Sequence, residues 1–169
     1  MNIRRYALKS GSLNNMQIRE EALPEPGPGE VQVAVKAIGL NFADVFAIWG
    51  LYKAAPKTEY TPGLEYAGVV EAVGDDVTTL HPGDKVMGVT RFGGYTTGLN
   101  IDARYVIPLP AGWDYAVGAS YLVQTLTAYY GMSMLGNLQK GQTVLIHSVA
   151  GGVGLQALKI AKSYGCYVV

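Results

Sequence analysis

Three glycines stand between a run of β-branched residues and an amphipathic segment near the end of the sequence. They are Gly151, Gly152 and Gly154, and they follow the run Thr143–Ile146. That run predicts a strand covered on both faces of a parallel sheet, and the residues 153–163 show the apolar spacing of a helix. A helix that starts directly after a glycine turn presents free N–H groups and a positive dipole end. These groups favour the binding of a phosphate.

The turn matches the dinucleotide-binding pattern G-x-G-x-x-G in part, because Val149 takes the first glycine position. Gly151 would let the backbone approach a pyrophosphate, and Gly154 would allow the helix to pack closely on the sheet. The strand before the turn and the helix after it favour nucleotide binding. The alternative is a plain βα turn that needs glycine for its geometry alone. We predict that five residues of this segment bind a cofactor: Ala150, Gly151, Gly152, Val153 and Gly154.

The remaining residues continue the same βαβ pattern. Gly165 stands where the C-terminal cap of the helix is expected, and Cys166–Val169 predicts a second strand. Such a strand would expose an apolar edge that invites pairing with another chain. A complete dinucleotide-binding domain has further strands, so we expect this chain to be a fragment of a longer protein, a natural truncation, or a half that assembles with partners. Cys166 is interpreted as a small packing residue rather than a nucleophile.

Composition narrows the class of protein. The formal net charge is zero and no basic cluster is present, which argues against nucleic acid or an anionic membrane as the main partner. No apolar run approaches the roughly 18–20 residues that span a bilayer, and no signal peptide follows the first residues. One cysteine excludes an internal disulfide, and together these features predict a cytoplasmic globular protein.

The first two-thirds of the chain has a different sequence pattern. Short candidate strands alternate with glycine and proline turns, and this pattern predicts a compact β-barrel or sandwich. The candidate strands are Val31–Lys36, Gly68–Gly74, a strand fed by the turn Pro82–Gly88, and further short strands within residues 95–110. Asp114 is a candidate cap for a helical region that runs to about Leu135.

Six short motifs, in the order of a known family, run along almost the whole chain. They are Gly39–Asp44, Gly50–Tyr52, Pro62–Gly68, Gly83–Val86, Gln124–Tyr130 and Ala150–Gly154. On these motifs the chain resembles the N-terminal half of a medium-chain dehydrogenase/reductase from the zinc-free quinone oxidoreductase branch. The vesicle amine transport protein-1-like subgroup is also similar. The resemblance implies a mixed α and β fold: a GroES-like β-barrel domain over residues 1–119, then an interdomain helix and an incomplete Rossmann domain over residues 120–169.

The resemblance also implies an activity. Family members reduce quinones, activated C=C bonds or carbonyl compounds with NADPH, and hydride passes from the nicotinamide to the electrophilic carbon. A homodimer is expected for the full-length protein. NADH is not excluded, because the residue that selects the cofactor lies beyond Val169. The alternative is a non-enzymatic binding or scaffold protein in which the nucleotide turn is vestigial.

No metal is expected. A catalytic zinc needs about three protein ligands from cysteine, histidine and carboxylates. Zinc-bearing relatives have a cysteine near the position of Asn41 and a histidine at the position of Leu64, whereas this chain has neither. Its single cysteine also rules out a four-cysteine structural zinc site.

The resemblance assigns roles to four side chains, each with a plainer alternative. Asn41 would hydrogen-bond the nicotinamide ribose or the substrate, or would only cap a turn. Tyr52 would orient the substrate or donate a proton, or would only pack. Thr127 would face the nicotinamide, or would bond to a carbonyl of its own helix. Gln124 stands where the family often has lysine or asparagine, and it would line the same cofactor pocket or would only tune its shape. Asn41, Tyr52 and Thr127 are therefore the predicted catalytic residues, and Glu65 is interpreted as a structural carboxylate.

Overall fold

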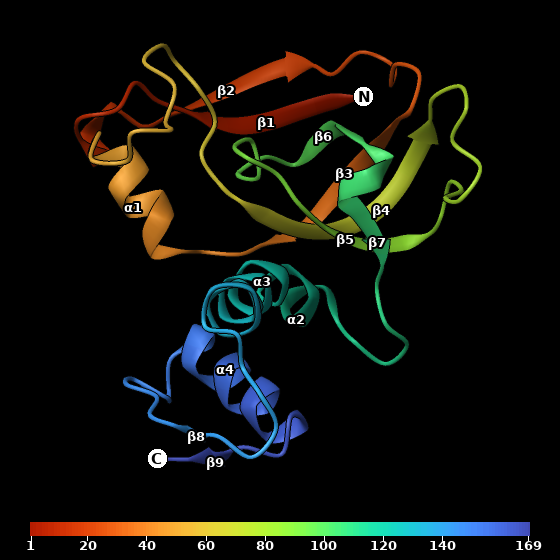
Figure 1. The fold of residues 1–169 in the computed structure, drawn as a ribbon. Helices are drawn as coiled ribbons and strands as arrows, with labels where there is room; N and C mark the ends of the chain where they lie inside the picture. The colour runs from red at the N-terminus through yellow and green to blue at the C-terminus, as the bar shows by residue number, and fades with distance from the viewer. The chain divides into compact units, whose positions relative to one another are not determined.

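The computed structural model describes all of residues 1–169, and the chain divides into two compact units, Met1–Ser120 and Tyr121–Val169. Figure 1 shows seven labelled strands, β1 to β7, in the first unit, whereas the second unit has the helices α3 and α4 with the two short strands β8 and β9.

The first unit is built on a five-stranded antiparallel sheet. The strands lie in the order β6-β3-β4-β5-β7, so the two longest strands, β3 and β4, are central. Their bounds are β3 Glu30–Ile38, β4 Glu65–Val73, β5 Lys85–Val89, β6 Gly98–Asp102 and β7 Val106–Pro108, with a 3-10 turn, η2, over Ala103–Tyr105. The predicted strands of this region are confirmed, with bounds shifted by a few residues.

The core of this unit follows from alternating side chains on the strands. Val31 and Val33 of β3 are fully buried and pack with Leu99 and Ile101 of β6, which lie opposite them in the register. Tyr66, Val70, Val86 and Val106 from the other three strands belong to the same cluster, as does Leu80 from the segment between β4 and β5. Because successive residues of a strand point to opposite faces, this pattern fixes which face of the sheet turns inward.

A β-hairpin and a short helix of the first unit were not predicted. The strands β1 (Asn2–Ala7) and β2 (Gln17–Ala22) form an antiparallel hairpin, with a 3-10 turn, η1, over Leu13–Asn15 between them. The hairpin is tied to the rest of the unit by backbone bonds, such as Tyr6 N–H to the Tyr95 carbonyl. The second unpredicted element is the short helix α1, Phe42–Ile48. Ile48 packs with Leu8 and Tyr60 in a second apolar cluster.

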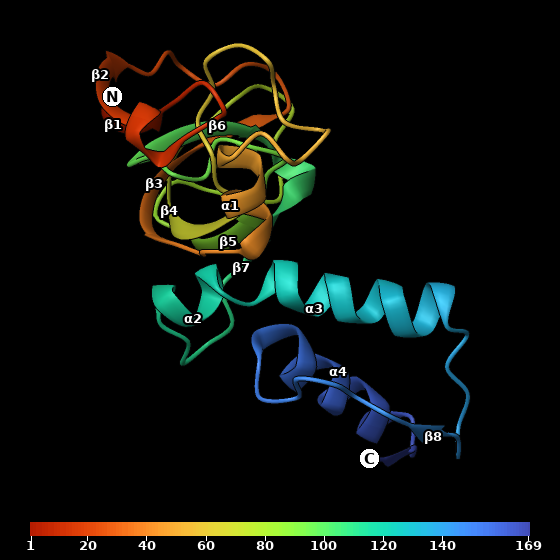
Figure 2. The ribbon, with the colours of Figure 1, turned by 90° about the vertical axis from the view of Figure 1, so that its left-hand side faces the viewer.

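The predicted helical region from the Asp114 cap to about Leu135 is confirmed, and it is divided into three elements. Asp114 does cap a helix, since its carboxylate accepts a bond from Val117 N–H at 2.8 Å, but that helix, α2, covers only Tyr115–Ala119. Ser120 then leaves the helical conformation, with φ −110° and ψ 19°. Helix α3 (Leu122–Tyr129) starts after it and runs into a π-helical segment, η3 (Tyr130–Leu135). Figure 2 shows α3 and η3 as one continuous coil.

The second unit contains one βαβ motif. Strand β8 (Thr143–Val144) pairs in parallel with β9 (Tyr167–Val168), and helix α4 (Gly152–Ser163) connects them and packs against α3. The prediction that the first strand is covered on both faces is wrong: Thr143 is exposed and Leu145 is 65% exposed. The reason is that β8 has only β9 as a neighbouring strand. No helix of the chain is both long and apolar enough to cross a membrane.

Helix α4 ends as the sequence predicts. Gly165 has φ +68°, in the left-handed region where glycine costs least. Its N–H donates to the Lys162 carbonyl at 2.9 Å, and the N–H of Cys166 donates to the Ala161 carbonyl at 3.0 Å. This pair of bonds is a Schellman motif, which satisfies carbonyls that the helix leaves free.

Candidate functional site

The glycine turn before α4 is shaped by close packing. Within it, Ser148 has a positive φ of 55°, whereas Gly151 has an ordinary φ of −76°. The N–H of Gly151 donates to the Ser148 carbonyl at 2.9 Å. A Cβ on Gly154 would lie 2.5 Å from the same carbonyl oxygen and 2.7 Å from Val149 Cα. Glycine is therefore required at position 154 because the helix lies against its own turn.

The first turn of α4 offers backbone donors. Leu155 N–H donates to the Gly151 carbonyl at 2.8 Å, which is the first bond of the helix. The N–H groups of Gly152, Val153 and Gly154 precede that bond and have no carbonyl of the helix to donate to. Ala150, Gly151 and Val153 are exposed at this end, and a Cβ on Gly151 would meet only the Ser148 carbonyl, at 3.3 Å. The geometry suits an anion.

Gln124 and Gly152 are brought together within the second unit. A Cβ on Gly152 would overlap the side-chain amide of Gln124, which lies on α3. Gln124 therefore covers the start of α4. Thr127, one turn further along α3, is exposed, and its hydroxyl donates to the Val123 carbonyl at 2.6 Å. A bond to a carbonyl of its own helix was the structural alternative predicted for Thr127. The hydroxyl oxygen can still accept a hydrogen bond from a ligand.

Asn41 is held at the start of α1 by its side chain and by its backbone. Its Nδ2 donates to Oε1 of Glu65 at 2.9 Å, and its backbone N–H donates to Oδ2 of Asp44 at 2.9 Å. Glu65 begins β4 and is only 1% exposed. A Cβ on Gly39 would lie 2.5 Å from Glu65 Oε1, so glycine leaves the space that this carboxyl occupies.

A second buried carboxyl, Asp44, extends this network. Asp44 is 3% exposed and accepts a bond from the phenol of Tyr95 at 3.0 Å, in addition to the bond from Asn41 N–H. Burial raises the pKa of Asp44 above its ordinary value, against the lowering effect of these hydrogen bonds. Burial, with the negative charge of Asp44 beside it, raises the pKa of Tyr95 as well.

Tyr52 lies in a different setting, beyond the end of α1. It is 41% exposed and makes an edge-to-face contact with Phe92, with ring centroids 6.5 Å apart. Phe92 contacts Tyr60 in the same way at 5.3 Å. Such edge-to-face contacts between aromatic rings are favourable. The role of Tyr52 in catalysis stays a prediction.

The predicted site residues therefore fall into two groups. Asn41 and Tyr52 belong to the first unit, with Asn41 joined to Glu65 and Asp44. Gln124, Thr127 and the glycine turn belong to the second unit. No group of three or more histidine, cysteine, aspartate or glutamate side chains is arranged to hold a metal ion.

Sequence reasoning missed Asp44 and Tyr95. A usable signal was present for Asp44, because Asn41 followed three residues later by an acidic residue is similar to a helix capping box. Tyr95 gave no such signal, since it lies 51 positions from Asp44 and reaches it only through the fold.

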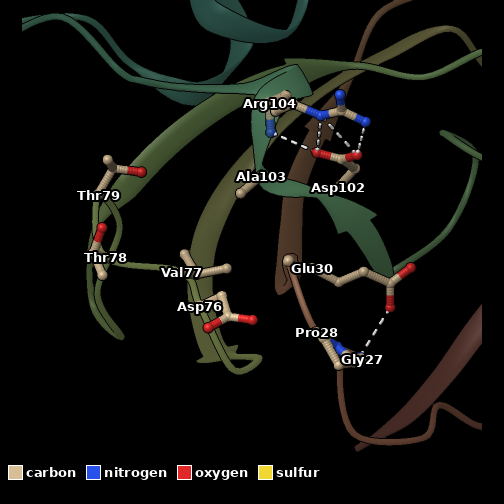
Figure 3. Close-up of a pocket in the computed structure, with 11 residues that line it drawn as sticks. Gly27, Pro28, Glu30, Asp76, Val77, Thr78, Thr79, Asp102, Ala103 and Arg104 are labelled. Carbon is tan, nitrogen blue, oxygen red and sulfur yellow. Dashed lines mark hydrogen bonds and ion pairs between the residues drawn. The ribbon is translucent and has the colours of Figure 1, made fainter.

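One further pocket, of about 820 Å³, lies elsewhere in the first unit (Figure 3). It is lined by polar side chains that include Glu30, Asp76 and the ion pair of Asp102 with Arg104 at 2.6 Å. Glu30 accepts a bond from Gly27 N–H at 3.0 Å. None of the predicted site residues lines this pocket.

Comparison with known protein families shows the family to which the chain belongs. Residues 27–111, about half of the chain, match the model of the alcohol dehydrogenase GroES-like domain. The chain belongs to this family. The match contains Asn41, Asp44, Glu65 and Tyr95, so the buried network described above is part of a GroES-like domain.

Two curated relatives of this GroES-like chain are similar over most of its length. Pikromycin polyketide synthase component PikAII of Streptomyces venezuelae is 45% identical over 150 residues, which are 88% of this chain and 4% of that protein. The human synaptic vesicle membrane protein VAT-1 homolog is 40% identical over 148 residues, which are 88% of this chain and 38% of that protein.

Solved structures agree with this kinship. The CurK enoyl reductase superimposes with a TM-score of 0.91 and 31% identity, covering 98% of this chain and 53% of that one. The Escherichia coli quinone oxidoreductase complexed with NADPH has a TM-score of 0.87 and 34% identity, covering 98% and 51%. The GroES-like chain thus spans about half the length of these structures. The predicted kinship with quinone oxidoreductases and VAT-1 proteins is confirmed.

Proposed function

We propose that this GroES-like chain belongs to a zinc-independent, NADPH-dependent reductase of quinones or activated C=C bonds. The observation that carries the proposal is the exposed glycine turn at the N-terminus of α4, where the first N–H groups have no carbonyl of the helix to donate to. An E. coli relative that is 34% identical was solved with NADPH, and CurK is an enoyl reductase. In this proposal the second unit is the beginning of a Rossmann domain.

The residues around the glycine turn leave space for the pyrophosphate of a dinucleotide. The exposed end of α4 at Ala150, Gly151 and Val153 leaves room for a pyrophosphate, and the helix dipole would stabilise its charge. The space beside Gly152 is occupied by the side chain of Gln124, and the space beside Gly154 by the backbone of Val149. These two glycines would therefore support the turn rather than touch the ligand.

The chemistry would rest on positioning. When bound, NADPH supplies a hydride, which is a proton with two electrons, to an electrophilic carbon. A proton from solvent completes the reduction. Asn41 would orient the ribose or the substrate, Thr127 would face the nicotinamide with its hydroxyl oxygen, and Tyr52 would line the substrate side. No strong acid or base is needed for such a reaction, because holding the reactants in place supplies most of the acceleration.

The absence of zinc is part of the proposal. Asn41 and Leu64 offer no thiolate or imidazole, and the side chain of Asn41 is already bonded to Glu65. Glu65 would then accept a hydrogen bond from Asn41 instead of binding a metal ion.

The test is NADPH oxidation by the complete product of the gene, with para-benzoquinone and with an enoyl compound as acceptors. We expect turnover that is lost in the variant Gly151→Asp, because a carboxylate at the mouth of the turn would repel the pyrophosphate. Gly151→Ala, which adds no charge, is the matched control and should retain much more activity. Absence of turnover with a broad panel of electrophiles would favour the alternative, a binding or scaffold protein.

A further inference from the structure

Glu65 is a buried carboxyl with an unusual position. It is 1% exposed, and it lies at the start of β4, directly beneath the residue predicted to contact the cofactor or substrate. Burying a carboxyl is costly unless it is hydrogen-bonded, and a neutral or apolar side chain would fill the same space at less cost. Its presence beside Asn41 therefore calls for a role besides packing.

The bond from Asn41 Nδ2 to Glu65 Oε1 gives the amide a direction. Both hydrogens of an asparagine amide are on its nitrogen, and the nitrogen end faces the carboxyl. Turning the amide around would place its carbonyl oxygen against the oxygen of Glu65, and two acceptors repel each other. The carbonyl end, Oδ1, is thus the end that does not face the carboxyl.

The backbone of Asn41 is fixed as well. Its N–H donates to Asp44 at 2.9 Å, and Asp44 in turn accepts a bond from Tyr95 at 3.0 Å. The backbone bond holds the main chain of Asn41, the amide bond holds its side chain, and both acceptors are buried.

We propose that Glu65 is a positioning residue, which turns Asn41 so that its carbonyl oxygen is offered to a hydrogen-bond donor on the ligand. This inference rests on the proposed function and narrows it. Of the two ligands predicted for Asn41, the ribose carries hydroxyl donors, whereas a quinone oxygen only accepts. The contact made by Oδ1 of Asn41 is therefore with a hydroxyl of the dinucleotide ribose.

The first test needs no activity. In the 169-residue chain, the side-chain NH₂ of Asn41 is followed by ¹⁵N NMR. We expect slow hydrogen exchange in the wild type, and a shifted, faster-exchanging signal in Glu65→Gln, because a glutamine amide can bond to either end of Asn41. Rapid exchange in the wild type, or a signal that Glu65→Gln leaves unchanged, would overturn the positioning role.

The second test uses the complete product of the gene. Loss of one hydrogen bond to a ligand hydroxyl is expected to raise the KM for NADPH about tenfold in Glu65→Gln, with a much smaller change in the KM for the quinone. Asn41→Ala should act alike, and the double variant should be no worse than either single variant, since both changes remove one contact. Additive effects, or a rise confined to the quinone KM, would contradict the inference.

A control separates positioning from lost stability. Val70→Ala opens the core of the same strand, β4, at a residue that is 1% exposed and belongs to the main apolar cluster. It should lower stability and leave the KM for NADPH unchanged. If the wild type shows no hydride transfer at all, the proposed function fails, while the NMR result still decides whether Glu65 positions Asn41.

Discussion

The phenol of Tyr95 donates to Oδ2 of Asp44 at 3.0 Å and thereby joins the segment before β6 to the first turn of helix α1. Both residues are buried, at 8% and 3% exposure. The same carboxyl oxygen accepts the backbone N–H of Asn41. One aspartate therefore fixes the beginning of the helix that carries the predicted site residue.

Removal of this phenol should destabilise the first unit. In Tyr95→Phe the buried Asp44 loses a donor, and a buried polar group left without its partner costs about 1–3 kcal/mol. Urea denaturation followed by fluorescence would show the loss as a lower midpoint with an unchanged slope.

Tyr66→Phe is the matched control for that change. The hydroxyl of Tyr66 is buried without a hydrogen-bond partner, and burial raises its pKa. Because no bond is lost, this variant should be as stable as the wild type or more stable. A destabilisation equal to that of Tyr95→Phe would show that the bond from Tyr95 to Asp44 does not contribute to the free energy of unfolding.

The raised pKa of Asp44 predicts a pH dependence of stability. The folded state holds the Asp44 proton more tightly than the unfolded state, whose value is near the ordinary 3.8. The contribution of Asp44 is therefore fully present below that pH, and it is lost as the pH rises through the folded pKa. We expect the wild type to lose stability relative to Asp44→Asn over this interval and to run parallel to it at higher pH.

Denaturation of both proteins at a series of pH values measures this difference directly. A difference in the free energy of unfolding that stays constant from acid to neutral pH would mean that the pKa of Asp44 is not raised by folding.

The glycine turn predicts a contrast between two neighbouring positions. In Gly154→Ala the new Cβ would lie 2.5 Å from the backbone oxygen of Ser148, which cannot move away without distorting the turn. We expect a loss of about 1–3 kcal/mol, as for other overpacked sites. In Gly151→Ala the nearest atom is at 3.3 Å and the residue is exposed, so the loss should be far smaller.

Hydrogen exchange of the α4 amides is the suitable measurement, because it reports the stability of the second unit itself. Equal protection in the two variants would contradict the role of close packing at Gly154.

Local patterns in the sequence were enough to predict much of this protein. The strands around Val31 and Gly68, the Asp114 cap and the Gly165 cap depend on neighbours within a few residues, and each is present. The strand–turn–helix order at Gly151–Gly154 was likewise readable, because alternation and glycine placement are local properties. The family motifs were readable for the same reason, and they led to the correct kinship.

The tertiary structure decided what surrounds these elements. Asn41 was predicted from its position in a motif, but its bonds to Glu65 and Asp44 arise from the packing of β4 and α1, and Tyr95 joins them from 51 positions away. The break at Ser120 and the exposure of Leu145 likewise depend on which elements lie alongside. Residue types and spacing determine short-range structure, whereas burial, partners and the direction of an amide are set only when distant segments meet.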